Sequence, residues 1–251
     1  MNIITNKSND TNSIPIGYND TKTFYTSSKK GVENGIKSIK SDTPITPIPY
    51  INIKNNQRST VYISAPSGAG KSTLASKFIK EYRELLGKKF RTILITGNSL
   101  DDPTFTKIKG LIIIKIRDVD GFDEVRYTDL SDSLVIFDDF ESLDKDKLKK
   151  VLALIKDLLE LGRKQNSHCI VITHQTQQYN LTKPIIYECD TYCLSPASNP
   201  NAVKKFLIAH CDMDKKEALN IIDKCSQQFG FLIIHKAVPR YYMTDNIIQL
   251  I

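Results

Sequence analysis

The sequence predicts an α/β fold in which helices flank a mostly parallel central sheet, with a β-hairpin at the C-terminal end. From residue 60 onward, short apolar runs alternate with amphipathic helical segments, a pattern typical of parallel sheets covered on both faces. A glycine-rich turn separates the first apolar run from the first helical segment. Residues 229–251 have the strand pattern of a terminal hairpin.

Length and charge narrow the possible classes of protein. The 251 residues, 40% of them hydrophobic, are enough for one large core. No run of 18 apolar residues occurs, so we expect no membrane span. The polar N-terminus lacks the apolar stretch of a signal peptide, which predicts an intracellular, non-secreted protein. The net charge of +7 suits a polyanion such as DNA, although the abundant Lys, Asn and Ile also fit an AT-rich genome.

The five cysteines favour reduced intracellular thiols, because their number is odd and no CxxC pair occurs. A zinc site is the alternative, although its spacing fits no common zinc motif. Its ligands would be Cys189, Cys193, His210 and Cys211.

The first 56 residues differ from the rest of the chain. They hold nine asparagines and four of the ten prolines, and their hydrophobic periodicity is poor. We therefore expect an extended N-terminal arm over 1–56, with a short strand near 50–53. A single domain is expected over 57–251.

The elements of this domain follow from their hydrophobic patterns. Buried strands are predicted at 60–64, 90–96, 110–116, 132–139 and 168–175. Helices are predicted where apolar residues recur at helical spacing, at 72–87, 144–164 and about 214–225. We expect the last 50 residues to hold only the third helix and the terminal hairpin.

The turn after the first strand, APSGAGKS, fits the spacing of a phosphate-binding loop, with Ala65 where glycine usually stands. Small residues let backbone N–H groups close around phosphate oxygens at the start of the next helix. Lys71 can reach the β- and γ-phosphates of ATP, and the Ser72 hydroxyl can bind Mg²⁺. Ala65 is acceptable if it avoids positive φ. The predicted ATP-binding residues are Ala65, Pro66, Ser67, Gly68, Ala69, Gly70, Lys71, Ser72 and Thr73.

A second part of the site is predicted where the strand 132–139 ends. The apolar strand delivers Asp138 to the carboxyl edge of the sheet, where it would bind Mg²⁺ directly or through water. Asp139 is our candidate for orienting the attacking water, with Glu141 as the alternative. Both acids could instead cap the helix that follows.

Strands 90–96 and 110–116 lie between the phosphate loop and Asp138 in the sequence. We expect at least one of them to lie between these two parts of the site in the sheet, as in ATP-driven motors. Simple nucleotide kinases instead place the two strands side by side. Kinases also usually carry an arginine-rich lid, and no segment of this chain has two arginines close together.

Residues 161–177 supply two further candidates. Gln175 ends a buried strand and would lie level with Asp138, where it could hydrogen-bond the γ-phosphate or water. Alternatively, Thr173, His174 and Gln175 only terminate the strand. Arg163 ends the preceding helix, on the opposite edge of the sheet if the crossover is right-handed. From there it could act on a neighbouring subunit's nucleotide as an arginine finger, or only stabilise its own helix C-terminus.

Four stretches together resemble the poxvirus-type genome-packaging ATPases of double-stranded DNA viruses, within the FtsK–HerA superfamily of P-loop NTPases. They are APSGAGKST, ILITGNSLDDPTF, LVIFDDFESL and LGRKQNSHCIVITHQ. The closing FLIIHKAVPRYY is similar as well. The resemblance covers about residues 57–251. The sequence departs from the superfamily at Ala65, which replaces glycine, and at Asp139, where many members have glutamate.

The resemblance implies a RecA-like ATPase core that assembles into a ring, often a hexamer, and uses ATP and Mg²⁺ to thread double-stranded DNA into a capsid. A capsid or portal vertex would be a further partner, in the virion or in the host-cell cytoplasm. Alternatives are another DNA-pumping ATPase of the superfamily, a nucleotide kinase and a nucleotide switch that does not hydrolyse ATP.

Overall fold

The computed structural model describes residues 2–5, 13–27, 36–51, 58–87, 90–118, 122–176, 179–225, 230–236 and 240–251. The chain forms two compact units, each of which is considered separately below. One unit is Ile53–Cys189, and the other combines Met1–Asn52 with Asp190–Ile251. None of the helices among the described residues is long and apolar enough to cross a membrane.

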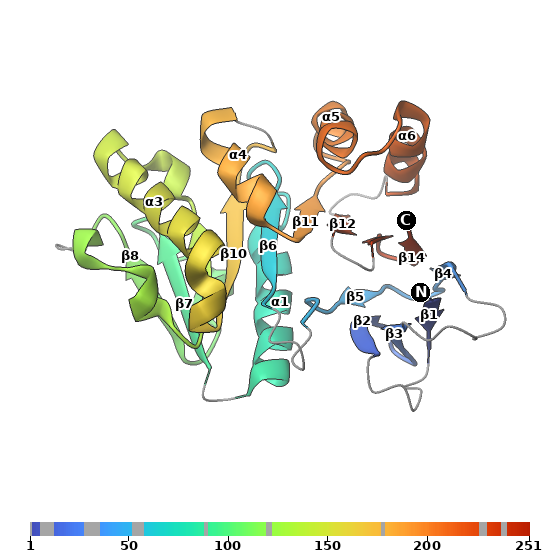
Figure 1. The fold of residues 1–251 in the computed structure, drawn as a ribbon, viewed down its shortest axis with the longest axis horizontal. Helices are drawn as coiled ribbons and strands as arrows, with labels where there is room; N and C mark the ends of the chain where they lie inside the picture. The colour runs from blue at the N-terminus through green and yellow to red at the C-terminus, as the bar shows by residue number, and fades with distance from the viewer. Residues whose placement is uncertain are drawn as a thin grey trace. The chain divides into compact units, whose positions relative to one another are not determined.

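The unit of residues 53–189 is built on a parallel sheet (Figure 1). Its strands are β6 (Thr60–Ser64), β7 (Arg91–Thr96), β8 (Leu111–Lys115), β9 (Ser133–Asp138) and β10 (Ser167–Thr173). They lie in the order β6–β10–β9–β7–β8, and every neighbouring pair is parallel. The structure therefore confirms the predicted fold class and all five predicted strands.

Helices cover both faces of this sheet. They are α1 (Lys71–Leu86), α2 (Pro103–Thr106), α3 (Lys145–Leu161) and α4 (Tyr179–Glu188), with short 3₁₀ turns η2 (Phe122–Glu124), η3 (Tyr127–Leu130), η4 (Phe140–Ser142) and η5 (Gly162–Gln165). The connection β6–α1–β7 and the connection β9–α3–β10 run in opposite directions across the sheet. Right-handed crossovers therefore place α1 and α3 on opposite faces. Helices α3 and α4 pack together on one face (Figure 1).

The strand order corrects one prediction. A strand does lie between β6 and β9, but it is β10, which comes after β9 in the chain, and neither β7 nor β8. In the sequence β8 is as apolar as the central strands, yet Ile112 is exposed and its other residues are only partly buried, because β8 lies at the end of the parallel array. Apolar content alone therefore does not distinguish a strand at the end of the parallel sheet from one in its interior. As a result, the carboxyl ends of β6, β10 and β9 meet at one edge.

The second unit is antiparallel. In one sheet the order is β1–β3–β2–β5, formed by β1 (Asn2–Ile4), β2 (Ile14–Tyr18), β3 (Thr23–Ser27) and β5 (Thr46–Pro47). Another series runs β11–β12–β13–β14–β4, formed by β4 (Ser38–Lys40), β11 (Thr191–Leu194), β12 (Leu232–His235), β13 (Tyr241–Met243) and β14 (Ile247–Leu250). Helices α5 (Pro200–His210) and α6 (Lys215–Lys224) pack against each other. The terminal hairpin is present as β12 and β13, with β14 added to it.

The N-terminal segment carries more regular structure than its composition indicated. Strands β1 to β5 lie within it, and they bury Ile3, Ile16 and Phe24 almost completely. Alternation within β2 and β3 is short, which is why it was not recognised from the sequence. The strand expected near 50–53 falls partly on residues 52 and 53, which lie outside the described residues.

Helix α5 was not predicted. It starts after Asn199, whose side chain accepts a hydrogen bond from the Ala202 amide at 3.1 Å, and it has Pro200 in its first turn. Both features are typical helix starts. The predicted helix near 214–225 is present as α6.

Candidate functional site

The turn between β6 and α1 forms an open loop at the carboxyl edge of the parallel sheet. Gly68 and Gly70 have φ values of 77° and 90°, a region that residues with side chains rarely adopt. Ala65 is not among the positive-φ residues of the described chain, so the condition for replacing glycine there is met. Helix α1 has no side-chain cap at its start, which leaves its first N–H groups available to an anion.

Lys71 reaches into the centre of the site. Its Nζ atom donates a hydrogen bond to the Pro66 carbonyl at 3.1 Å and lies 3.3 Å from Nδ1 of His174. Burial lowers the pKa of Lys71, while the negative charges of nearby carboxylates, Asp138 first among them, act in the opposite direction. The lysine is therefore a largely desolvated cation placed among acids.

Asp138 ends β9 and is 6% exposed. Burial first, and then the charge of Asp139, raise the pKa of Asp138 to about 7, although the charge of Lys71 acts to lower it. A buried carboxylate that is disfavoured by desolvation and by a neighbouring anion gains strongly from a nearby cation. This environment suits a residue that binds a divalent metal ion.

Asp139 and Glu141 both meet His174. The Oδ1 atom of Asp139 lies 2.8 Å from Nε2 of His174, and its Oδ2 atom accepts a longer bond of 3.4 Å from Asn98. The Oε2 atom of Glu141 accepts a hydrogen bond of 2.8 Å from the His174 backbone N–H. Asp139 makes no side-chain capping bond, and α3 is capped by Asp144 instead. The structure thus gives no support to a capping role for Asp139.

Three residues of the site were missed in the sequence analysis, namely His174, Asn98 and Asp102. The Asp102 carboxylate accepts a hydrogen bond of 2.7 Å from the Thr104 amide, and it lies near the Ser72 hydroxyl. Partial burial acts to raise the pKa of Asp102, but these two contacts act together to bring it below its usual range. Asn98 and Asp102 follow β7, which pairs with β9, so the strand order would have indicated them.

Two predicted residues do not join this cluster. Gln175 has an exposed side chain, and its backbone carbonyl accepts a hydrogen bond of 2.9 Å from the Tyr62 hydroxyl. His174, one residue earlier, is the residue after β10 that contacts Lys71 and Asp139. Arg163 is exposed in η5, just before β10 begins, at the opposite edge of the sheet from the phosphate loop.

The oxygen donors present fit a magnesium–nucleotide complex. Ser72 and Asp138 offer a hydroxyl and a carboxylate, with Asp102 beside Ser72. No group of three or more His, Cys, Asp or Glu among the described residues could hold a metal ion by itself. Mg²⁺ commonly uses only one or two carboxylates together with phosphate oxygens and water. The five cysteines are buried free thiols, and the described chain contains no cluster that would support the zinc alternative.

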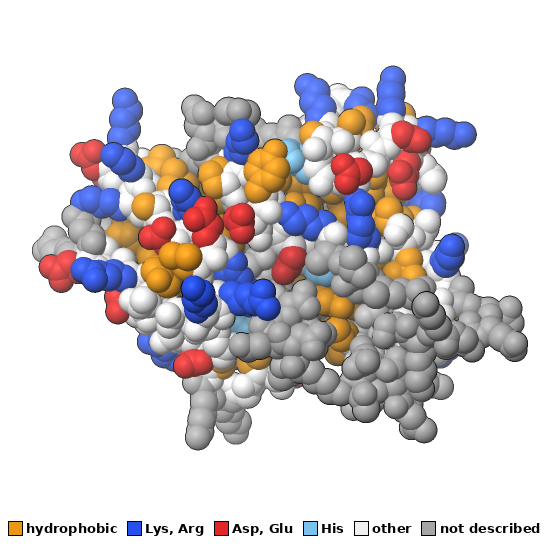
Figure 2. Space-filling model, viewed as in Figure 1, with side chains coloured by type: hydrophobic (Ala, Val, Ile, Leu, Met, Phe, Trp, Pro, Cys, Tyr) orange, Lys and Arg blue, Asp and Glu red, His pale blue; other side chains and the backbone are white. Residues whose placement is uncertain are grey.

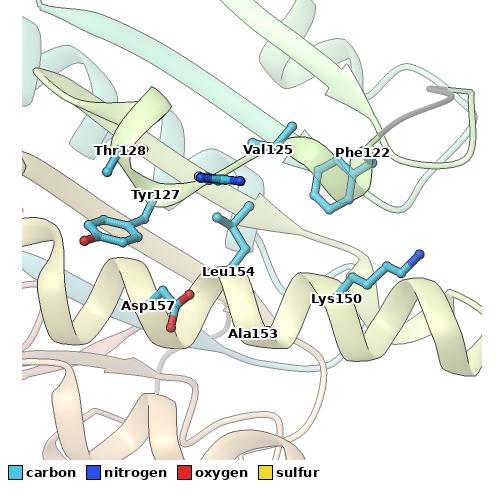
Figure 3. A pocket seen from close by; sticks show the side chains of 9 residues that line it. Phe122, Val125, Tyr127, Thr128, Lys150, Ala153, Leu154 and Asp157 are labelled. Atoms are coloured by element: carbon cyan, nitrogen blue, oxygen red, sulfur yellow. The ribbon is translucent and has the colours of Figure 1, made fainter.

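A separate cavity of about 530 Å³ lies along α3 (Figure 3). Phe122, Tyr127 and Thr128 line one side of it, while Leu154 and Asp157 line the α3 side. Its lining includes no residue of the phosphate loop and none of the acids at the end of β9. We therefore place the candidate site at the phosphate loop.

Comparison with known proteins gives one relative by sequence. No protein-family model matches the chain. The "Uncharacterized protein V3" of the Sputnik virophage is 28% identical over 203 residues, which is 79% of each chain.

Solved structures with the same fold include a viral DNA-packaging ATPase and a conjugation coupling protein. The DNA-packaging ATPase B204 from Sulfolobus turreted icosahedral virus has a TM-score of 0.53 at 16% identity, over 76% of this chain and 98% of its own. The pCW3 conjugation coupling protein TcpA has a TM-score of 0.54 at 10% identity, over 94% of this chain and 77% of its own. B204 of the related virus 2 has been solved with AMPPCP, with a TM-score of 0.51 at 15% identity over 75% and 96%. These neighbours show a P-loop NTPase fold and confirm, at the level of the fold, the resemblance to packaging ATPases.

Proposed function

We propose that the protein is an ATP-hydrolysing motor subunit that moves double-stranded DNA into a viral capsid. The observation that carries this proposal is the meeting of the phosphate loop, buried Asp138 and the His174–Asp139 pair at one sheet edge, with β10 between β6 and β9. This strand order is that of ATP-driven motors, whereas nucleotide kinases place the two strands side by side. The fold likeness to a viral DNA-packaging ATPase supports a packaging role, and the likeness to a conjugation coupling protein keeps another DNA-pumping role as the alternative.

Each part of the site has a role in this proposal. The backbone of residues 65–73 would bind the triphosphate, with Lys71 on the β- and γ-phosphates. Ser72 and Asp138 would hold Mg²⁺, which when bound offsets the negative charge of the phosphates. Asp139 would orient the attacking water, and Glu141 is the alternative for that role.

We further propose that the subunits form a ring around DNA, with a capsid or portal vertex as partner, in the virion or in the host-cell cytoplasm. The net charge of +7 favours a polyanion. Among the described residues on the face in Figure 2, Lys and Arg side chains are interspersed with Asp and Glu. A basic track for DNA would therefore come from another face or from several subunits together.

The proposal is tested by measuring phosphate release from ATP with and without linear double-stranded DNA. We expect hydrolysis that DNA accelerates. Lys71→Ala should remove most nucleotide binding or hydrolysis without unfolding the chain, because the Lys71 side chain would bind the nucleotide and is not part of the apolar core. Circular dichroism and a melting curve of this variant control for folding. Wild-type hydrolysis by Lys71→Ala would refute the proposal.

Phosphate release, combined with assays of phosphate transfer, nucleotide binding and capsid association, separates the alternative functions. Phosphate transfer to added nucleosides without DNA stimulation would favour a kinase. Nucleotide binding without hydrolysis would favour a switch. DNA-stimulated hydrolysis together with failure to associate with capsids would favour another DNA-pumping ATPase.

A further inference from the structure

His174 contacts three charged residues of the candidate site, Lys71, Asp139 and Glu141. Its Nδ1 atom lies 3.3 Å from Nζ of Lys71, and its Nε2 atom lies 2.8 Å from Oδ1 of Asp139. Its backbone N–H donates to Oε2 of Glu141 at 2.8 Å. The His174 side chain is 38% exposed, so it borders the open part of the site.

The chemistry of the two neighbours determines which ring nitrogen carries the proton. A lysine ammonium can only donate hydrogen bonds, so Nδ1 of His174 must be the acceptor in the contact with Lys71. A neutral imidazole that accepts at Nδ1 carries its proton at Nε2. Nε2–H therefore donates to the Asp139 carboxylate. The result is a directed chain of hydrogen bonds from Lys71 through His174 to Asp139.

His174 is also the main contact that holds the Asp139 carboxylate. The other side-chain contact, from Asn98, is 3.4 Å long and correspondingly weak. Asp139 has a φ of 52° and follows the last residue of β9, so neighbouring strand residues do not fix its side chain. Without His174 the carboxylate could rotate away from the position in which it would orient water.

We propose that His174 is a positioning residue that orients Asp139 and couples it to Lys71. This inference rests on the proposed ATPase function. When Lys71 turns toward bound phosphates, Nδ1 of His174 loses its donor while Nε2–H keeps Asp139 in place. Nucleotide binding would therefore change the hydrogen bonding of the ring that holds the Asp139 carboxylate.

Two substitutions separate the two halves of this chain of contacts. In His174→Gln the longer amide can place an N–H group near the Nε2 position and still donate to Asp139. In His174→Asn the shorter side chain can offer an acceptor to Lys71 but cannot reach Asp139. His174→Ala loses both contacts.

We expect His174→Ala and His174→Asn to lower kcat by about 10- to 100-fold, the size typical of residues that orient a catalytic group. ATP affinity and KM should change by less than about threefold, since the phosphate loop is intact. His174→Gln should recover most of kcat. His210→Ala, which removes a histidine from α5, is the matched control and should behave as wild type.

Several results would overturn the inference. Equal kcat values for the Gln and Asn variants would show that donation to Asp139 is unimportant. Wild-type kcat in His174→Ala would remove the positioning role altogether. A parallel loss of ATP affinity and kcat would indicate that His174 only supports the phosphate loop.

The ring nitrogens can be observed directly by ¹⁵N NMR, because the chain has only four histidines. We expect the Nε2–H form of His174 without nucleotide, and a shift of its Nδ1 signal when AMPPCP and Mg²⁺ are added. An Nδ1–H form, or no response to nucleotide, would contradict the proposed chain. If the wild type hydrolyses no ATP even with DNA, the proposed function fails, whereas this spectrum still tests the arrangement.

Discussion

Asp138 and Asp139 are adjacent in the sequence but lie in different surroundings. Asp138 is 6% exposed at the end of β9, whereas the Asp139 side chain is 31% exposed and contacts His174. A desolvated carboxylate is best stabilised by a cation, and a more open one can hydrogen-bond water. Burial thus supports the division of roles that the sequence suggested for these two acids.

The first prediction, at this scale, concerns the choice between Asp139 and Glu141. Asp139→Asn keeps the shape of the side chain but removes the charge that would orient water. We expect it to bind ATP normally and to hydrolyse ATP at a rate at least about 100-fold below that of the wild type. Rapid-quench hydrolysis and nucleotide titration measure the two properties separately.

Glu141→Gln is the matched variant for that prediction. Its amide oxygen can still accept the hydrogen bond from the His174 backbone, so hydrolysis should remain near the wild-type rate. Slow hydrolysis in Glu141→Gln together with a near-normal rate in Asp139→Asn would reverse the assignment.

At the scale of secondary structure elements, β7 and β9 approach each other closely just beyond their ends. A Cβ atom on Gly97 would collide with the backbone carbonyl oxygen of Asp139 and lie 3.0 Å from the Cα atom of Phe140. These are backbone atoms, so no side chain can rotate to relieve the collision. Gly97 therefore allows Asp139 to take its place in the site.

A prediction follows for Gly97→Ala. We expect a loss of unfolding free energy of about 1–3 kcal/mol, as for other overpacked sites, together with a fall in kcat that exceeds any loss of ATP affinity. Chemical denaturation and steady-state kinetics measure the two effects. An unchanged kcat would show that the close approach is not needed to position Asp139.

His168 in β10 makes the stability of the sheet sensitive to acid. Its ring is 2% exposed, accepts a hydrogen bond from the Ser59 amide at 3.1 Å, and packs against Tyr82 and Phe90. Burial lowers the pKa of His168 to about 4. An unfolded histidine binds its proton near pH 6.5, so the unfolded state takes up the proton first as the pH falls. The contribution of His168 is therefore complete above pH 6.5 and is lost between pH 6.5 and 4.

The corresponding prediction is that unfolding free energy falls by about 3 kcal/mol over this pH range because of His168. His168→Asn can still accept the Ser59 hydrogen bond and does not titrate, so its stability should depend less on pH. Urea denaturation at several pH values measures the slope. His235 is also buried with a pKa lowered by burial, so some slope should remain in the variant. Identical slopes in both proteins would contradict the prediction.

At the scale of the whole molecule, the phosphate loop and Arg163 lie at opposite edges of one sheet. From this position we predict that Arg163 acts on the nucleotide of a neighbouring subunit. We predict that ATPase activity per subunit rises with protein concentration and rises further with DNA. Arg163→Ala should lower the assembled rate by about 100-fold or more and leave ATP affinity nearly unchanged.

A mixing experiment is the sharpest form of this prediction. Lys71→Ala subunits keep Arg163, and Arg163→Ala subunits keep a working phosphate loop, so each should be inactive alone. When they are mixed, some interfaces should pair an intact loop with an intact arginine, and activity should partly return. A mixture that assembles normally but stays inactive would mean that Arg163 acts within its own subunit or only stabilises the C-terminus of its own helix.

The sequence by itself determined the phosphate loop, the acidic strand end, the five strands of the parallel sheet and the helices α1 and α3. These features depend on local patterns, namely the spacing of apolar residues and a turn that only small residues can form. Where the local pattern was short or unusual, as in β2, β3 and α5, the prediction from sequence missed the element.

Only the tertiary structure decided which strand lies between β6 and β9, and with it which residues meet at the site. Parallel strands pair through backbone hydrogen bonds, which do not depend on the identity of the side chains. Accordingly, β8 is as apolar as β10, although β8 lies at the end of the parallel array and β10 lies inside it. Placing β10 beside β6 and β9 brings His174 to Lys71 and Asp139, which lie 103 and 35 residues away in the chain. Contacts between such distant residues depend on the pairing of whole strands, and no local pattern encodes that pairing.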